Sequence, residues 1–211
     1  MDKLRLRFEK TGRAVYISHL DLMRMMQRAF FRAELPLVYS EGFNPHARIS
    51  VLLPLGIGTA SRCELLDFGL REDFSEKDIL RRLNDALPEG LRALGVKAPV
   101  KKSAELAWVR LEGELREGRD AGFYTRLFET APLCVQHRTK RGESELSLRE
   151  HIRSITFEDM GEGAVRCECV LKAQNPSIRP ELLIAAMGED APGYFRFERT
   201  EVYDGNMQPF E

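Results

Sequence analysis

The sequence predicts an α+β fold built from two ferredoxin-like units, each with the element order β-α-β-β-α-β and an antiparallel sheet. Three observations support this prediction. Segments with apolar residues at every second position alternate with segments whose apolar residues recur every three to four positions. The 211 residues, 43% of them hydrophobic, allow one large or two small packed domains. The same order of elements occurs twice, without a repeat of identical residues.

The first unit is predicted over residues 1–100. Leu4, Leu6 and Phe8 alternate with charged residues, which is typical of a half-buried strand. Ser18 precedes a segment with apolar residues at helical spacing, and Pro36 ends that segment, so we expect a helix between them. The remaining predicted elements are strands at 49–55, 63–70 and 91–96, and a second helix that Ser75 caps.

The second unit is predicted over residues 104–211, after a lysine-rich junction. Its helices are expected at 121–130 and 179–187, and Pro180 is compatible with the first turn of the latter. Its strands are expected at 107–115, 133–139, 164–172 and 195–203, with a hairpin tip at 140–142.

Charge is unevenly distributed along the chain. The total is nearly neutral, with 32 basic and 33 acidic residues. Residues 1–53, however, hold nine lysines and arginines against five acidic residues. This composition excludes a disordered tail, a collagen-like chain and a uniformly basic coat protein. The basic first quarter indicates an anionic partner or an ordinary solvated surface.

The composition also gives expectations about cofactors and location. Four cysteines, none in a Cys-x-x-Cys pair, predict neither a disulfide framework nor a metal centre, and we expect no cofactor. Cys167 and Cys169 are two apart, as on one buried face of a strand. No apolar stretch is long enough for a signal peptide or a membrane span, so we expect a cytoplasmic protein.

The first predicted helix carries a column of arginines. Arg24, Arg28 and Arg32 are spaced four residues apart and therefore lie on one side of the helix, with Phe31 nearby. Guanidinium groups beside an aromatic ring suit phosphates and stacked bases. Because few acidic residues share this face, we expect it to bind an anion. The alternative is an ordinary solvated surface on which Phe31 covers the neighbouring unit.

Two histidines are candidate acid–base residues. His19 is expected to open the first helix, where the helix dipole favours neutral imidazole. His46 follows a turn with Phe43 and Asn44, and Gly42 supplies unusual backbone angles. We expect this loop to lie beside the start of the helix and to contact a ligand. Structural or hydrogen-bonding roles are the alternative for both histidines.

The second unit has one concentrated basic feature. It consists of His137, Arg138, Lys140 and Arg141, around the predicted hairpin tip. These side chains either extend an anion-binding groove or form an exposed turn with solvated charges.

Three segments resemble the radical-SAM-linked family, a bacterial family of unknown function. They are residues 16–24 (YISHLDLMR), 39–46 (YSEGFNPH) and 54–58 (PLGIG), and Ala47 departs from the family pattern by replacing an expected proline. In that family the domain is fused to, or encoded beside, a cobalamin-binding-type radical SAM protein, often near a ribonuclease E/G-type gene. The resemblance implies a radical SAM partner and a context of RNA metabolism. The chain lacks the Cys-x-x-x-Cys-x-x-Cys motif, so it cannot perform that chemistry alone.

Three functions follow from these observations. The first is an RNA-binding accessory protein, with tRNA as one candidate ligand, in which the arginine column contacts phosphates and Phe43, Asn44 and His46 contact a nucleotide. The second is a metal-independent endoribonuclease, because paired ferredoxin-like units also resemble CRISPR repeat-processing enzymes, with His19 or His46 as acid or base. The third is a protein-interaction subunit of the radical SAM enzyme. The first is preferred, and a non-enzymatic role is favoured.

Overall fold

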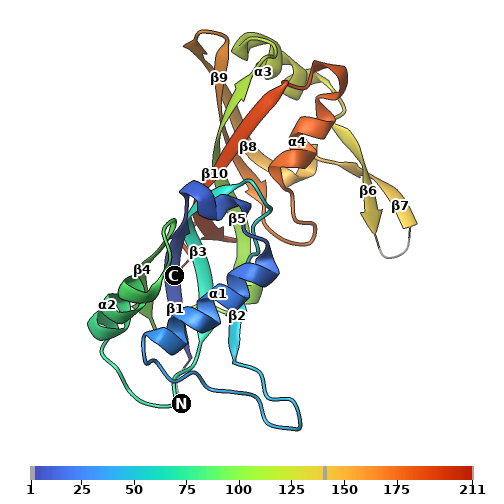
Figure 1. Cartoon of the computed structure of the whole chain (residues 1–211). Helices are drawn as coiled ribbons and strands as arrows, with labels where there is room; N and C mark the ends of the chain where they lie inside the picture. The colour runs from blue at the N-terminus through green and yellow to red at the C-terminus, as the bar shows by residue number, and fades with distance from the viewer. Residues whose placement is uncertain (1–2, 140–141, 211) are drawn as a thin grey trace. The chain divides into compact units, whose positions relative to one another are not determined.

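The computed structural model describes residues 3–139 and 142–210, with the backbone alone for residues 137–139 and 143. The chain divides into two compact units (Figure 1). One extends to Glu105 and includes Phe210, and the other is Leu106–Pro209. Both combine helices with antiparallel strands, which confirms the predicted α+β class.

The first unit has the strand order β4-β1-β3-β2, with every pair antiparallel. This is the order expected of a ferredoxin-like unit. Its elements are β1 (Leu4–Lys10), a short helix η1 (Gly12–Tyr16), α1 (His19–Arg32), β2 (Ile49–Val51), β3 (Ala60–Phe68), α2 (Glu76–Ala86), β4 (Leu91–Lys97) and η2 (Ser103–Glu105).

Both helices of this unit pack on one face of its sheet. The core contains Leu6 and Phe8 of β1, Met26 and Phe30 of α1 and Leu83 of α2, all fully buried. Each such side chain contributes roughly 1.5–3 kcal/mol by leaving water. The apolar spacing that predicted α1 is therefore the spacing of its buried face.

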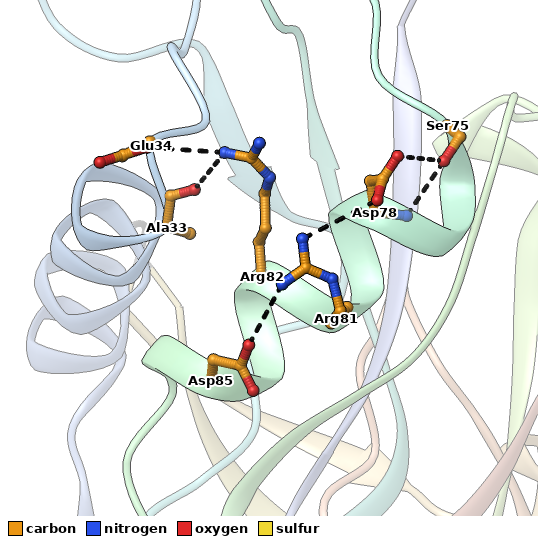
Figure 2. Close-up of polar contacts among 7 residues, drawn as sticks. All are labelled: Ala33, Glu34, Ser75, Asp78, Arg81, Arg82 and Asp85. Atoms are coloured by element: carbon orange, nitrogen blue, oxygen red, sulfur yellow. Dashed lines mark hydrogen bonds and ion pairs between the residues drawn. The ribbon is translucent and has the colours of Figure 1, made fainter.

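The two helices stabilise each other at their C-terminal ends. Arg32 of α1 donates to the carbonyl of Ala86, the last residue of α2, at 2.7 Å. Arg82 of α2 donates to the carbonyl of Ala33 at 3.4 Å and lies 3.8 Å from Glu34 (Figure 2). Because helix C-termini carry unsatisfied carbonyls and partial negative charge, each guanidinium is favourably placed. These contacts fix α1 against α2.

A buried ion pair connects β1 and β3. The Nε and Nη2 atoms of Arg5 donate to the two oxygens of Asp67 at 2.7 and 3.2 Å, and both side chains are at most 4% exposed. Lys3 adds a third contact to this carboxylate, at 2.7 Å. The ring of Phe210 lies 5.1 Å from the Arg5 guanidinium carbon. Phe210, near the end of the chain, thus packs on the first unit.

The second unit has the main strand order β10-β5-β9-β8, again antiparallel. Its elements are β5 (Leu106–Arg116), α3 (Ala121–Thr130), β6 (Cys134–Thr139), β7 (Gly142–Ser147), η3 (Arg149–His151), β8 (Ile152–Gly161), β9 (Ala164–Lys172), α4 (Pro180–Ala186), η4 (Gly188–Asp190) and β10 (Tyr194–Asp204).

The second unit departs from the sequence prediction at two strands. β6 pairs with β7 in a separate two-stranded sheet, and the strand beside β9 is β8, which was not predicted. β8 is the last strand in the order of the main sheet and most of its side chains are exposed, so its sequence shows little alternation of apolar and polar residues. Phe157 is the residue of β8 that packs on α3, because its ring lies 5.5 Å from that of Tyr124 and 5.3 Å from that of Phe128.

Candidate nucleic-acid interface

The arginine column lies exposed on α1, but its three members differ in their contacts. Arg24 is 3.3 Å from Asp21, and Arg32 is bonded to Ala86. The side chain of Arg28 has no hydrogen bond or ion pair with any residue in the described part of the chain. One acidic residue, Asp21, lies three positions before Arg24 and partly balances its charge. Arg28 is the cation best placed to meet an external anion.

The N-terminus of α1 is held by a side-chain cap. The amide of Asp21 donates to Ser18 Oγ at 3.2 Å, and the Ser18 hydroxyl donates to Asp21 Oδ2 at 2.7 Å. The hydrogen bond from this hydroxyl lowers the pKa of Asp21, desolvation opposes it, and the nearby Arg24 guanidinium lowers the pKa further. Asp21 therefore keeps its negative charge in mild acid.

His19 is the first residue of α1 and is exposed, as the sequence predicts. The loop at residues 54–58 is bonded to η1, the short helix that precedes α1, because the amide of Gly58 donates to the carbonyl of Val15 at 2.9 Å. Gly58 adopts a φ of +90°, which favours glycine. Leu20 of α1 and Ile57 of this loop are 59% and 61% exposed. Both segments therefore expose a large apolar side chain.

Residues 36–48 form a projecting arm between α1 and β2 (Figure 1). One side of the arm pairs with the chain after β3, as the bridge between Leu37 and Leu70 shows. Near the tip, Ser40 and His46 close the arm. The Ser40 amide donates to the His46 carbonyl at 2.8 Å, and the His46 amide donates to Ser40 Oγ at 3.0 Å. The predicted turn at residues 42–45 is therefore the tip of a hairpin-like arm.

The tip of the arm presents three side chains to solvent. Phe43 is fully exposed, at 109%, and Asn44 and His46 are also exposed. His46 Nδ1 lies 2.8 Å from the Asn44 carbonyl oxygen. Because a carbonyl only accepts, Nδ1 carries the proton and Nε2 is left for an external partner. Gly42 has a φ of +115°, so its predicted backbone role is confirmed.

The expected position of this loop beside the start of α1 is wrong. Figure 1 shows the arm projecting from the unit well away from the first turn of α1. The 54–58 loop, and not the arm, is bonded to the segment that precedes α1, through Gly58 and Val15 of η1. His19 and His46 consequently belong to different surfaces, and no paired acid–base arrangement of these two residues is formed.

A groove of about 780 Å³ separates the C-terminal half of α1 from the stem of the arm. Phe31 is 84% exposed and lines this groove. Tyr39 lines the other side, and the Arg71 guanidinium carbon lies 5.6 Å from its ring centroid. The full lining is Gln27, Phe31, Arg32, Glu34, Leu35, Pro36, Leu37, Tyr39, Arg71 and Glu72.

Tyr39 and Arg71 were not predicted as site residues. Leu35 and Leu37 are two positions apart and both are buried, which was a usable signal for an extended segment. Tyr39 continues this spacing and is exposed. Arg71 has no such signal. Its amide donates to the Pro36 carbonyl at 2.8 Å, a tertiary contact that brings it to the groove.

The cysteines are placed as ordinary core and surface residues. Within residues 3–139 and 142–210, no group of three or more His, Cys, Asp or Glu residues is arranged to hold a metal ion. Cys167 and Cys169 are buried on β9, as expected from their spacing. A hydrogen bond with Cys167, together with burial, raises the pKa of the Cys169 thiol. The Cys169 thiol is therefore neutral.

The basic hairpin of the second unit is described in part. Arg138 lies on β6 opposite Glu143 of β7. Lys140 and Arg141 lie outside the described residues, so the assignment of Arg138, Lys140 and Arg141 to nucleic-acid binding stays a prediction.

The fold and the site define a two-unit α+β protein with an exposed arginine helix, a projecting arm and an aromatic groove on its first unit. The chain belongs to a bacterial family described as "Uncharacterized protein conserved in bacteria (DUF2344)", whose model matches residues 3–180. A search of the curated proteins finds no match. In the part of the chain that the structure describes, no helix is long and apolar enough to cross a membrane.

Proposed function

We propose that this protein is an RNA-binding accessory protein that presents a structured RNA, with tRNA as the first candidate, to a modifying enzyme. One observation carries the proposal: the arginine column of α1 is exposed, and Arg28 within it has no partner in the described structure. Guanidinium groups in such a column suit successive phosphates.

An exposed arginine on α2 of the same unit, unlike Arg28, is paired with acidic residues. Arg81 on α2 lies 3.9 Å from Asp78 and 3.6 Å from Asp85 (Figure 2). Its charge is balanced by carboxylates on its own helix, whereas Arg28 has none. Arg81 therefore provides a matched control for Arg28, since both are exposed arginines on helices of the same unit.

The arm supports the same proposal. A phenylalanine at full exposure gains nothing from the fold, because its ring leaves water only when a partner binds. At the arm tip, Phe43 is accompanied by two groups that can form hydrogen bonds with a nucleotide, the Asn44 amide and His46 Nε2. Aromatic rings stack on bases, so the arm suits an unpaired region of RNA.

The modifying enzyme is proposed to be a radical SAM protein. This part of the proposal rests on the three segments that resemble the radical-SAM-linked family and on the absence of a radical SAM cysteine motif from the chain. Co-purification of the two proteins tests it. We expect the tagged protein to retain a radical SAM enzyme through washing, and failure to do so with or without tRNA would contradict the partnership.

RNA binding is tested by fluorescence anisotropy with labelled bacterial tRNA over a range of salt concentrations. The triple change Arg24→Gln, Arg28→Gln and Arg32→Gln should weaken binding by a factor of about ten or more and flatten the salt dependence. Arg28→Gln alone should lower the slope by about one ion pair, while Arg81→Gln should leave both affinity and slope unchanged. No binding by the wild-type protein at low micromolar concentration would refute the proposal.

A further inference from the structure

The groove between α1 and the stem of the arm has a composition that the phosphate contacts do not explain. The charged side chains that line it are those of Arg32, Arg71, Glu34 and Glu72. Two positive and two negative charges leave it without a net attraction for a phosphate. The ligand that fits such a lining is uncharged, flat and able to hydrogen-bond.

We propose that this groove holds one unstacked base of the bound RNA, with Phe31 and Tyr39 as its stacking surfaces. The inference rests on the proposed RNA binding and names the part of the RNA that enters the site. A base removed from its stack is read by aromatic side chains and by hydrogen bonds to its edge, and both kinds of group line this groove.

The stacking surfaces come from two elements. Phe31 is 84% exposed near the end of α1, and Tyr39 is 44% exposed on the arm. Arg71 lies over the Tyr39 ring at 5.6 Å, which orients the ring and places a cation at the edge of the groove. The contacts between Arg32 and Ala86 and between Arg82 and Ala33 fix the end of α1 that carries Phe31. The groove is therefore formed before a ligand arrives.

The groove also contains polar groups that can recognise a base edge. Gln27 is half-buried and lines the groove. Its side chain makes no hydrogen bond with another residue of the described chain. Its amide offers both a donor and an acceptor, as the Watson–Crick edge of a base does. Glu72 adds a carboxylate that accepts from ring N–H or amino groups. The volume of about 780 Å³ lies within the usual range for small-molecule sites and accommodates a nucleotide.

The position of the groove connects the two predicted contact surfaces. Arg32 belongs to both the arginine column and the groove lining, and Tyr39 belongs to the stem whose tip carries Phe43. Phosphates on the column, a base in the groove and a second unpaired nucleotide at the arm tip then follow one path across the first unit.

The test compares Phe31→Leu with the wild-type protein on two ligands, bacterial tRNA and a fully paired RNA duplex, by anisotropy over a range of salt concentrations. Removing one stacking ring should weaken tRNA binding about tenfold, leave the salt slope unchanged and leave duplex binding unchanged. Tyr39→Leu should behave in the same way. Tyr194→Leu, which removes a ring of 45% exposure from β10 in the second unit, is the matched control and should have no effect.

The outcomes separate this inference from the proposal on which it rests. If the wild-type protein binds neither ligand, RNA binding itself is wrong. If the wild-type protein binds tRNA but Phe31→Leu stays within about twofold of it, RNA binding stands and the base pocket is refuted. A loss of duplex binding equal to the loss of tRNA binding also refutes the pocket, because a duplex offers no unstacked base. Circular dichroism of Phe31→Leu should match the wild type, since this side chain contributes little to the core.

Discussion

Replacing Asp67 by alanine should destabilise the first unit strongly. Asp67 is 4% exposed and accepts two hydrogen bonds from Arg5, which is 3% exposed. The change removes this carboxylate while the guanidinium charge stays buried, and breaking a buried pair in this way costs about 3–5 kcal/mol. The contact from Lys3 adds little, because that side chain is 59% exposed.

The expected loss is large relative to the whole stability of the unit. A unit of this size has a free energy of unfolding of roughly 5–15 kcal/mol. With a urea dependence of about 2 kcal/mol per molar, a loss of 4 kcal/mol lowers the unfolding midpoint by about 2 M. Far-UV circular dichroism is the suitable signal, because α1 and α2 contribute to it while the single tryptophan, Trp108, lies in the second unit.

Two further variants determine whether charge burial is the cause. Asp85→Ala removes an exposed carboxylate from α2 and should leave the midpoint unchanged. The double change Arg5→Met with Asp67→Leu removes both charges and should recover most of the loss. An Asp67→Ala midpoint equal to that of the wild type would refute the reasoning, as would a double variant no more stable than Asp67→Ala.

Three other predictions concern the helix ends and the thiols. Ser18→Ala should raise the pKa of Asp21 towards its ordinary value, which a carboxylate titration by NMR measures; an unchanged titration would show that Ser18 is not the cause. Because the folded-state pKa of Asp21 is lowered, its stabilising contribution is present above the ordinary pKa of an aspartate and is lost as the pH falls through the lowered value. Arg82→Gln should reduce the melting temperature by a few degrees, since a charge at a helix C-terminus contributes about 0.3–1 kcal/mol, whereas Arg81→Gln should not. In the native protein a chromogenic thiol reagent should modify Cys134 alone, because this cysteine is exposed; partial desolvation and the Glu145 carboxylate raise the pKa of this thiol, so its reaction should become faster as the pH rises, and rapid reaction of a second cysteine would contradict the burial of the other three.

Local patterns predicted most of the fold. The first unit follows from alternation in β1, from Ser18 and Ser75 as caps and from the 3.6-residue spacing of buried residues in α1. β8 was missed because a strand at the end of a sheet buries few side chains and needs little apolar alternation. The short β2 was predicted too long, because Pro54 and the turn after it end the pairing that stops at Val51.

The candidate site was predicted where it depends on one element and missed where it depends on several. Helical spacing predicted the exposed column that includes Arg28, and the turn residues predicted the backbone of Gly42. The groove was missed because Phe31, Tyr39 and Arg71 come from a helix, the arm and the chain after β3. Only the pairing of the arm with residues 69–71 brings these side chains together, and local periodicity does not reveal such pairing.

The hydrogen bond inside the arm tip determines which ring nitrogen of His46 is left for a ligand. Nδ1 lies 2.8 Å from the Asn44 carbonyl oxygen, which only accepts, so Nδ1 is the donor in this bond. In that tautomer Nε2 accepts, so it would pair with a ligand group that donates, such as the amino group of a base, and not with a phosphate oxygen. The arm tip would therefore recognise the base of a nucleotide, while its phosphates would be left to the guanidinium groups of α1.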